Sequence, residues 1–304
     1  MVITDLDNTL YDWVTSFVPA FYSMVDAACE LLDVPKEQLL DEMQAVHRRY
    51  GNSEQPFALL ETPIVACRFP NFDAEERRRH LDPVFHVFNK VRRNSLQLYD
   101  SVRETLQVIQ QSGALTVAHT DAHVGNSLFR LSKLDLTELV ARLYAPLKQS
   151  GTELICSSAN GLHALRDYVH VLPPEDRKPN PKALLDICAD YSVQPTRTLY
   201  IGDSLFRDIH MANQASVHSA WARYGTNYNP ELWSKLVRIT HWTDDDVATE
   251  AQLRVEAGDV HAEVDLNQFS DVLASFTFSR GANGDLPAQG IEPVSAVLPQ
   301  SPDV

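Results

Sequence analysis

Hydrophobic and polar positions follow two different patterns along this chain, and they divide it into an all-helical part and a mixed part. Between residues 14 and 95, apolar side chains recur three and four positions apart, which is the spacing of one buried helix face. Strand patterns are scarce in this stretch, so we expect an all-helical segment. The first predicted helix carries the stripe Phe17, Phe21, Met24, Val25 and Ala28 and ends at Val34-Pro35, and the others cover residues 36–50, 57–67 and 74–94.

The rest of the chain alternates short apolar runs with helical patterns. We expect strands at residues 1–5, 114–119, 153–156, 169–172, 198–201 and 217–221. We expect helices at residues 101–112, 124–143, 181–191 and 205–213, a helical turn at 161–168, and a last helix at 264–273 that docks on the core. Strands that alternate with helices are typical of a parallel sheet with right-handed crossovers, so the pattern predicts an α/β fold.

Composition restricts the classes of partner. The 304 residues are 44% hydrophobic, which suffices for a large core, and the net charge of −15 opposes the basic footprint that nonspecific nucleic-acid binding needs. No apolar run approaches the ~20 residues of a membrane span. The four cysteines stand far apart without a CxxC pair, which argues against a zinc site and a disulfide framework. We expect a cytoplasmic protein with buried free thiols and neither a nucleic-acid nor a membrane partner, and the oligomeric state stays open.

Two carboxylates follow the first predicted strand. Asp5 and Asp7 stand one residue apart behind the apolar pair Val2-Ile3, and side chains at i and i+2 of a strand point to the same side. Ligands of open α/β sheets bind at the carboxyl ends of the strands. Crowded carboxylates repel one another unless a cation or a shared proton intervenes. The pair therefore indicates a divalent metal, a nucleophile or an acid/base pair, although a plain surface turn can also carry this sequence.

Polar residues also follow the later strands. Thr120 and Asp121 come after the strand at 114–119, and Asp203 comes after the strand at 198–201, with Asp208 five residues further on. Lys178 precedes Pro179-Asn180-Pro181 at the start of a predicted helix. Because the carboxyl ends of parallel strands share one edge of the sheet, these side chains are expected to converge.

In these four segments the chain resembles the haloacid dehalogenase superfamily. The motifs occur in order as Asp5-Leu6-Asp7-Asn8-Thr9, Thr120 after an apolar strand, Lys178-Pro179-Asn180-Pro181, and Gly202-Asp203-Ser204-Leu205-Phe206-Arg207-Asp208. The resemblance implies a Rossmann-like three-layer α/β/α parallel sheet with an inserted all-helical cap of the C1 type. It also implies a discontinuous catalytic core at 1–13 and 96–250 and a cap at 14–95. The resemblance leaves out the C-terminal extension at 251–304, which we expect to be partly disordered, because Gly, Pro, Ala and Ser dominate and aromatic residues are absent from residue 280 onward. The Asp-Asn-Thr-Leu-Tyr wording further resembles pyrimidine 5′-nucleotidase-like members.

The resemblance assigns roles to the two aspartates of the first motif and to the metal ligands. Asp5 would be the nucleophile that forms an aspartyl-phosphate, and Asp7 the general acid/base. Mg²⁺ would be the cofactor, bound by the Asp5 side chain, the Asp7 backbone carbonyl and Asp203. Asp208 would hold a metal-bound water or orient Lys178. Read alone, Asp208 is also compatible with simple complementarity to a helix dipole.

The resemblance assigns further roles in holding the substrate. Thr120 and Lys178 would contact the phosphoryl oxygens, and Lys178 would also neutralise the carboxylates. Thr9 would bind substrate, or cap the following turn through its hydroxyl. Asp121 stands where relatives often carry Asn, and we expect it to form hydrogen bonds near the substrate. Thr120 alone reads as a turn residue, and Lys178 alone as a solvated lysine.

The function implied is Mg²⁺-dependent hydrolysis of a phosphomonoester of a small metabolite, such as a nucleotide, sugar or organic-acid phosphate. A phosphomutase or a dehalogenase on the same fold remains an alternative, although Asp7 and Asp203 argue against the dehalogenase. A binding protein that retains the fold without catalysis is the alternative from another class. The expected partner is a small-molecule phosphate ester.

Overall fold

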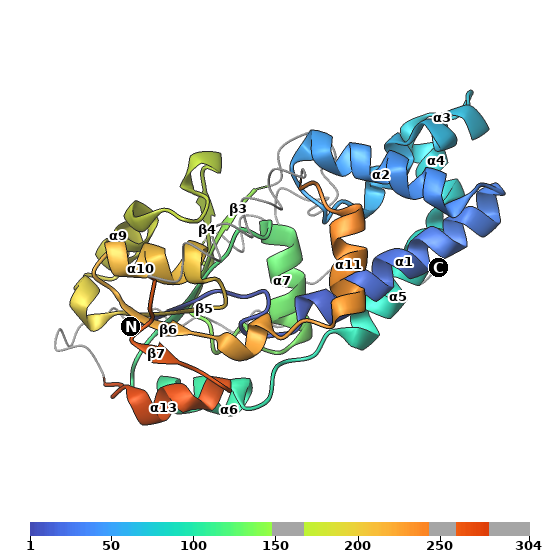
Figure 1. The fold of residues 1–304 in the computed structure, drawn as a ribbon. Helices are drawn as coiled ribbons and strands as arrows, with labels where there is room; N and C mark the ends of the chain where they lie inside the picture. The colour runs from blue at the N-terminus through green and yellow to red at the C-terminus, as the bar shows by residue number, and fades with distance from the viewer. Residues whose placement is uncertain (148–166, 243–259, 280–304) are drawn as a thin grey trace.

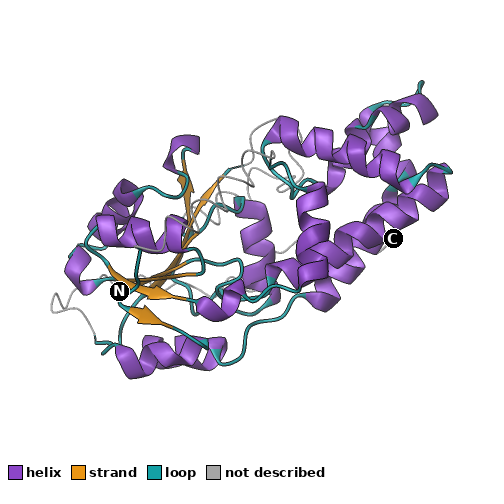
Figure 2. Ribbon diagram, viewed as in Figure 1, coloured by secondary structure: helices purple, strands orange, loops and turns teal. Residues whose placement is uncertain are grey.

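A seven-stranded, fully parallel sheet forms the centre of the structure and confirms the predicted α/β fold (Figures 1 and 2). The computed structural model describes residues 1–147, 167–242 and 260–279. The strand order is β4-β3-β2-β1-β5-β6-β7, which places β1 in the middle. The strands are β1 (Val2–Thr4), β2 (Thr116–His119), β3 (Arg142–Pro146), β4 (Val169–Leu172), β5 (Leu199–Gly202), β6 (His218–Trp221) and β7 (Val264–Asp265).

Successive residues of the central strands face two separate apolar cores. In β1, Val2 packs into the core on one face and Ile3 into the core on the other. In β5, Leu199 and Ile201 face the first core while Tyr200 faces the second. This period of two is the pattern of strands buried on both faces, and it explains why they read as continuous apolar runs.

Helices cover both faces of the sheet and complete a three-layer arrangement. Side chains of α6, α7 and α13 join the core on the Val2 side, and side chains of α9 and α10 join the core on the Ile3 side. The covering helices are α6 (Val102–Gln111), α7 (Val124–Lys133), α9 (Pro181–Asp190), α10 (His210–Gln214) and α13 (Val272–Ser275).

A second body of helices stands beside the sheet and extends away from it (Figure 1). It is formed by residues 13–95, which lie between β1 and α6, and it has an apolar core of its own. We call it, together with α11 (Pro230–Ile239), the helical body. Its other helices are α1 (Trp13–Leu32), α2 (Lys36–Tyr50), α3 (Pro63–Arg68), α4 (Ala74–His80) and α5 (Asp82–Ser95), with a 3₁₀ turn at Pro56–Glu61.

Helix α11 lies far along the chain but packs on α1 and α2. Leu236 and Ile239 are buried in the apolar core of the helical body. The Nδ1 atom of the buried His47 lies 2.7 Å from the Ile239 carbonyl oxygen, and the Tyr22 hydroxyl donates to the Lys235 carbonyl at 3.1 Å. Residues 230–239, which the sequence analysis grouped with the catalytic core, therefore pack with the inserted helices.

Two predicted elements are wrong in type. The helix expected over 124–143 ends at Lys133, and residues 142–146 form β3. The chain leaves the helix at Asp135, whose φ of 49° is left-handed, and the apolar residues beyond it happen to repeat with helical spacing. The helix expected over 264–273 begins as strand β7 at the sheet edge, and only Val272–Ser275 is α-helical.

Several predictions fall outside the residues that the structure describes. These are the strand at 153–156, most of the helical turn at 161–168, and the disordered tail from residue 280. Of the three described cysteines, all free, Cys188 is buried whereas Cys67 is exposed, so the expectation of burial is wrong for Cys67. Among the described residues we find no helix with both the length and the apolarity to cross a membrane.

Candidate active site

A cavity of about 460 Å³ opens at the carboxyl edge of the sheet, between the sheet and the helical body. Parallel pairing brings the ends of β1, β2 and β5 side by side there, so residues nearly 200 positions apart meet. The polar lining includes Asp5, Asp7, Thr120, Asp121, Lys178, Asp203 and Asp208. The other lining residues are Asn8, Trp13, Ala122, Ser204, Leu205, Phe206, Arg207, Trp221, Thr226, Tyr228, Trp233, Leu236 and Trp242.

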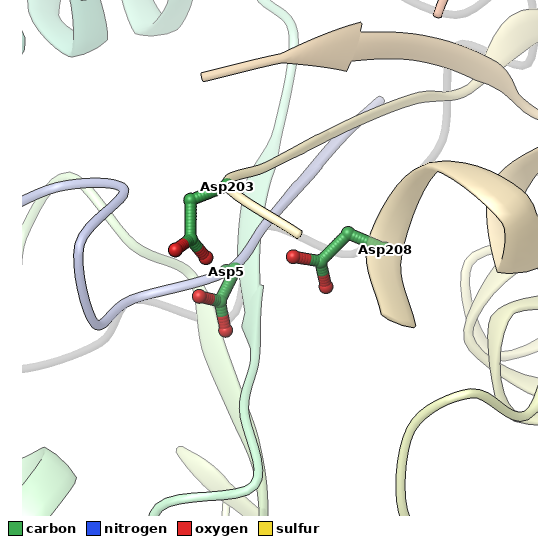
Figure 3. A group of neighbouring side chains, drawn as sticks. All are labelled: Asp5, Asp203 and Asp208. Carbon is green, nitrogen blue, oxygen red and sulfur yellow. The ribbon is translucent and has the colours of Figure 1, made fainter. Parts of the chain in front are cut away.

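Three carboxylates converge at this edge (Figure 3). Each of Asp5, Asp203 and Asp208 offers an oxygen, and these oxygens all lie within 4.8 Å of one another. Asp5 follows β1, and its backbone N–H donates to the Ile201 carbonyl of β5 at 2.8 Å. Asp203 follows β5, and Asp208 lies in the helical turn Leu205–Ile209 behind it. The ends of two neighbouring strands and the turn after one of them thus position the cluster.

Gly202 permits this close packing. A Cβ atom added there would lie 2.4 Å from the Asp208 carboxyl carbon, which is closer than a real Cβ contact. The Asp208 carboxylate is held there by the Ser204 backbone N–H and the Tyr200 hydroxyl, both at 3.0 Å. Any larger residue at position 202 would displace the carboxylate or the end of β5.

Lys178, three residues before α9, bridges two of the carboxylates. Its Nζ lies 2.5 Å from Asp5 Oδ1 and 2.9 Å from Asp208 Oδ1, and its side chain is 4% exposed. Burial alone would lower the pKa of this amine, but Asp208 and Asp5 together raise it well above its usual range. The Lys178 backbone N–H donates to Asp121 Oδ1 at 3.1 Å, so Asp121 fixes the segment that carries the amine.

Negative charge exceeds positive charge in the cluster. Burial, with Asp208 adding to it and Lys178 opposing it, raises the pKa of the Asp5 carboxyl to about 7. Burial and then the repulsion of Asp5 and Asp208 raise the pKa of Asp203 well above its usual range. One ammonium shared between Asp5 and Asp208 does not neutralise three carboxylates. A hard divalent cation with oxygen ligands, such as Mg²⁺, fits this donor set.

The Asp7 carboxylate is held apart from this cluster by an arginine. Both of its oxygens accept from Arg130 Nη1, at 2.9 and 3.2 Å. Arg130 lies on α7 and is 3% exposed, and its Nη2 donates to Glu54 of the helical body. Glu54 also accepts from Trp13 Nε1 at 2.7 Å and from Asn126 Nδ2 at 2.9 Å. A buried network therefore links Asp7 to the helical body.

The two threonines occupy different positions. Thr120 lies at the end of β2, lines the cavity, and accepts from the Ala122 backbone N–H at 3.1 Å. Thr9 is fully buried, and its hydroxyl donates to Asp5 Oδ2 at 3.4 Å. This geometry favours a supporting role for Thr9, and its predicted contact with substrate stays a prediction.

Arg130, Glu54 and the aromatic residues at 228–242 were not among the predicted site residues. Arg130 gave a usable signal, because it interrupts the buried stripe that Ser127 and Leu131 define on α7, where a charge is unexpected. Glu54 lies in an irregular loop with no pattern to mark it. The aromatic residues at 228–242 come after the fourth motif, and only tertiary packing brings them to the cavity.

Comparison with known proteins agrees with this geometry. The family model described as haloacid dehalogenase-like hydrolase matches residues 1–216. The N-acetylmuramic acid 6-phosphate phosphatase of Pseudomonas aeruginosa is 39% identical over 248 residues, which cover 79% of this chain and 90% of that protein. The glyceraldehyde 3-phosphate phosphatase of Methanopyrus kandleri is 26% identical over 229 residues, which cover 74% of this chain and 84% of that protein.

Solved structures show the same fold. A 2-haloacid dehalogenase from Pseudomonas syringae pv. tomato aligns with a TM-score of 0.53 at 18% identity, covering 91% of this chain and 98% of that one. A haloacid dehalogenase-family phosphatase from Thermococcus onnurineus aligns with a TM-score of 0.52 at 15% identity, covering 92% and 99%. At these identities the likeness concerns the fold alone.

Proposed function

Because the chain belongs to the haloacid dehalogenase-like hydrolase family, we propose that it is a Mg²⁺-dependent phosphatase of a small phosphorylated metabolite, acting through an aspartyl-phosphate on Asp5. The observation that carries this proposal is the cluster of Asp5, Asp203 and Asp208, two of which contact the Lys178 amine, in the lining of a cavity. The phosphatase names of the two relatives support the reaction type.

In the first step, an Asp5 carboxylate oxygen attacks phosphorus. A bond forms between Asp5 and the phosphoryl group as the ester P–O bond breaks, and Asp7 donates a proton to the departing alcohol oxygen. Lys178, which contacts Asp5 directly, stabilises the negative charge on the phosphoryl oxygens. Thr120, at the end of β2, contacts a phosphoryl oxygen through its hydroxyl.

In the second step, water hydrolyses the aspartyl-phosphate. Asp7 takes a proton from the water, whose oxygen forms a bond to phosphorus as the bond to Asp5 breaks. Inorganic phosphate leaves, and the Asp5 carboxylate is restored. Arg130 orients the ionised Asp7 for this proton transfer, because it holds both carboxylate oxygens.

Asp5 and Asp203 would bind the metal directly, with the Asp7 backbone carbonyl, and Asp208 would support it from behind. Mg²⁺, when bound, neutralises charge on the carboxylates and the transferring phosphoryl group. The pKa of Asp203, raised by burial and by its acidic neighbours, is the mark of a site that such a cation would relieve.

The helical body is proposed to act as a cap that excludes water and contacts the leaving group. Glu54 and Trp13 extend from it toward the Asp7–Arg130 pair, so it borders the chemistry directly. The relatives' names give a sugar and a triose phosphate as candidate substrate classes, and the resemblance to pyrimidine 5′-nucleotidases adds nucleotides.

The test is hydrolysis of an aryl phosphate by the purified protein. Phosphate release is expected with Mg²⁺ and not in excess chelator, and Asp5→Asn should abolish it. Borohydride reduction during turnover should convert the phosphorylated Asp5 to homoserine, which peptide mass mapping would detect. Full activity in chelator would overturn the metal's role, and an active Asp5→Asn variant would overturn the covalent mechanism.

A further inference from the structure

All four tryptophans of the chain line the one cavity that contains the aspartates. They are Trp13, Trp221, Trp233 and Trp242. Each is only partly buried, although Trp13 and Trp233 also pack against the apolar cores. Tyr228 and Phe206 line the same cavity. Large aromatic side chains that leave surface open to a polar cavity are typical of ligand sites.

Two of the tryptophans have evident structural tasks. The Trp13 indole N–H donates to Glu54 at 2.7 Å, and its ring stacks on Phe17 with centroids 5.1 Å apart. The Trp221 indole N–H donates to the Asp203 backbone carbonyl at 2.8 Å, at the end of β5. These contacts position Glu54 and Asp203 and explain both residues without a ligand.

The other two belong to a continuous row of rings, which we call the aromatic strip. The Tyr228 hydroxyl donates to Asp203 Oδ2 at 3.1 Å, so the strip starts at the carboxylate cluster. Tyr228 stacks on Trp233 with centroids 4.7 Å apart and planes 13° apart, and Trp233 lies 5.9 Å from Trp242. Trp233 belongs to α11 of the helical body, and Trp242 follows that helix. The strip therefore leads from the phosphoryl site toward the helical side of the cavity.

We propose that the aromatic strip binds the leaving group of the substrate, and that this leaving group contains a ring. This inference rests on the proposed phosphatase function and narrows its substrate class. A sugar ring and a nucleobase both present an extended flat face to an indole, whereas a linear triose or organic acid does not. The cavity of about 460 Å³ also holds far more than a phosphoryl group and lies within the usual range for small-molecule sites.

The experiment compares the kcat/KM of ring esters with that of a linear ester. The ring esters are glucosamine 6-phosphate and uridine 5′-monophosphate, and the linear ester is glycerol 3-phosphate. Wild type should prefer at least one ring ester to the linear one. Trp233→Leu and Trp242→Leu should each lower the ratio of ring to linear kcat/KM about tenfold (~1.4 kcal/mol), mainly through KM.

Ring-keeping and distant variants provide the controls. Trp233→Phe and Trp242→Phe retain a flat face and should recover part of the ratio. Phe72→Leu removes an exposed ring outside the residues that line the cavity, and should leave the ratio as in wild type. Thermal unfolding of every variant identifies any Leu variant that fails to fold. At such a position, the ratio of ring to linear kcat/KM in the Phe variant decides the test.

The outcomes distinguish a failure of this inference from a failure of the proposed phosphatase function. Wild type that hydrolyses none of the esters, nor an aryl phosphate with Mg²⁺, overturns the phosphatase function itself. Equal or better hydrolysis of glycerol 3-phosphate, or a ratio that the Leu variants leave unchanged, overturns the aromatic strip as a ring site and leaves the phosphatase intact. The preferred ring ester identifies the ring as a sugar or a base.

Discussion

The two sides of the cavity are built from different side chains. The sheet edge presents carboxylates and one amine, positioned by short strands and the turns that follow them. The side nearer the helical body presents aromatic rings, carried by α11 and by residues just before and just after it. Under the proposed function, the difference separates two tasks: the edge of the sheet would contain the reactive groups, and the aromatic side would provide surface for the rest of the substrate.

The two sides also differ in their effect on stability. At the sheet edge, like charges are crowded, and burial is the main cause of the raised pKa values of Asp5 and Asp203. Keeping these carboxyls ionised therefore lowers the stability of the folded protein. In the helical body, α11 buries Leu236 and Ile239 against α1 and α2, which stabilises the protein in the ordinary way. A substitution at the edge is therefore expected to affect activity first, and one in the helical body to affect stability first.

Among the substitutions that test this contrast, Gly202→Ala is expected to have the largest effect on activity. The added methyl would meet the Asp208 carboxylate at 2.4 Å and displace it from Lys178. We expect kcat/KM to fall about 100-fold or more, measured on an aryl phosphate. Gly51→Ala is the control, because that glycine has a φ of 58° with nothing within 4 Å, so it should lose stability without losing activity. Equal activity in the two variants would contradict the prediction.

Arg130→Met tests the link between the two sides. It leaves Asp7 and Glu54 facing each other without the guanidinium that both contact. We expect kcat to fall about 10- to 100-fold and the protein to lose about 3–5 kcal/mol, measured by steady-state kinetics and urea unfolding. Glu54→Gln, which keeps Arg130 beside Asp7, should cost less in both measurements. A kcat unchanged by Arg130→Met would show that Asp7 does not need to be oriented.

Asp203→Asn should lose activity and gain stability. The amide keeps the shape of the side chain and cannot ionise, whereas burial, and then the repulsion of Asp5 and Asp208, disfavours the charged form of the carboxyl and raises its pKa. In chelator we expect the variant to be about 1–3 kcal/mol more stable than wild type by urea unfolding. Mg²⁺ should stabilise wild type more than the variant. A less stable variant in chelator would show that the cluster is not under charge stress.

His47 gives the smallest effect and belongs to the helical body. Burial lowers its pKa, since the folded protein holds the ring neutral against Ile239 and Phe21. Its contribution to the free energy of unfolding is present above the unfolded pKa of about 6.5. That contribution is lost as the pH falls, because the unfolded chain binds the proton first. Between pH 7.5 and 5.5, wild type should lose about 2–4 °C more in Tm than His47→Gln. Parallel losses would contradict this.

The sequence predicted the sheet edge better than the side built on the helical body, for a physical reason. Asp5, Thr120 and Asp203 each follow an apolar strand, so the geometry of a parallel sheet by itself implies that they meet. The ordered motifs supplied Lys178 and Asp208. The structure brings Asp5, Lys178, Asp203 and Asp208 into one cluster and holds the Asp7 carboxylate at Arg130 instead.

The rest depended on contacts that local pattern does not encode. The Arg130–Glu54 pair joins a helix to an irregular loop 76 residues away, and His47 contacts Ile239 across 192 residues. Strand β3 was misread because its neighbourhood repeats apolar residues with helical spacing. In these cases tertiary packing, and not the propensity of a segment, decided the structure.

The position of α11 constrains how this scaffold can be recombined. A chimera that received residues 13–95 from a relative would set foreign helices against the host's Leu236 and Ile239, which share one apolar core with α1 and α2. Such a graft would keep its packing only if residues 230–239 travelled with it. The module that can be transferred is one unit in space, but two separate segments of the sequence encode it.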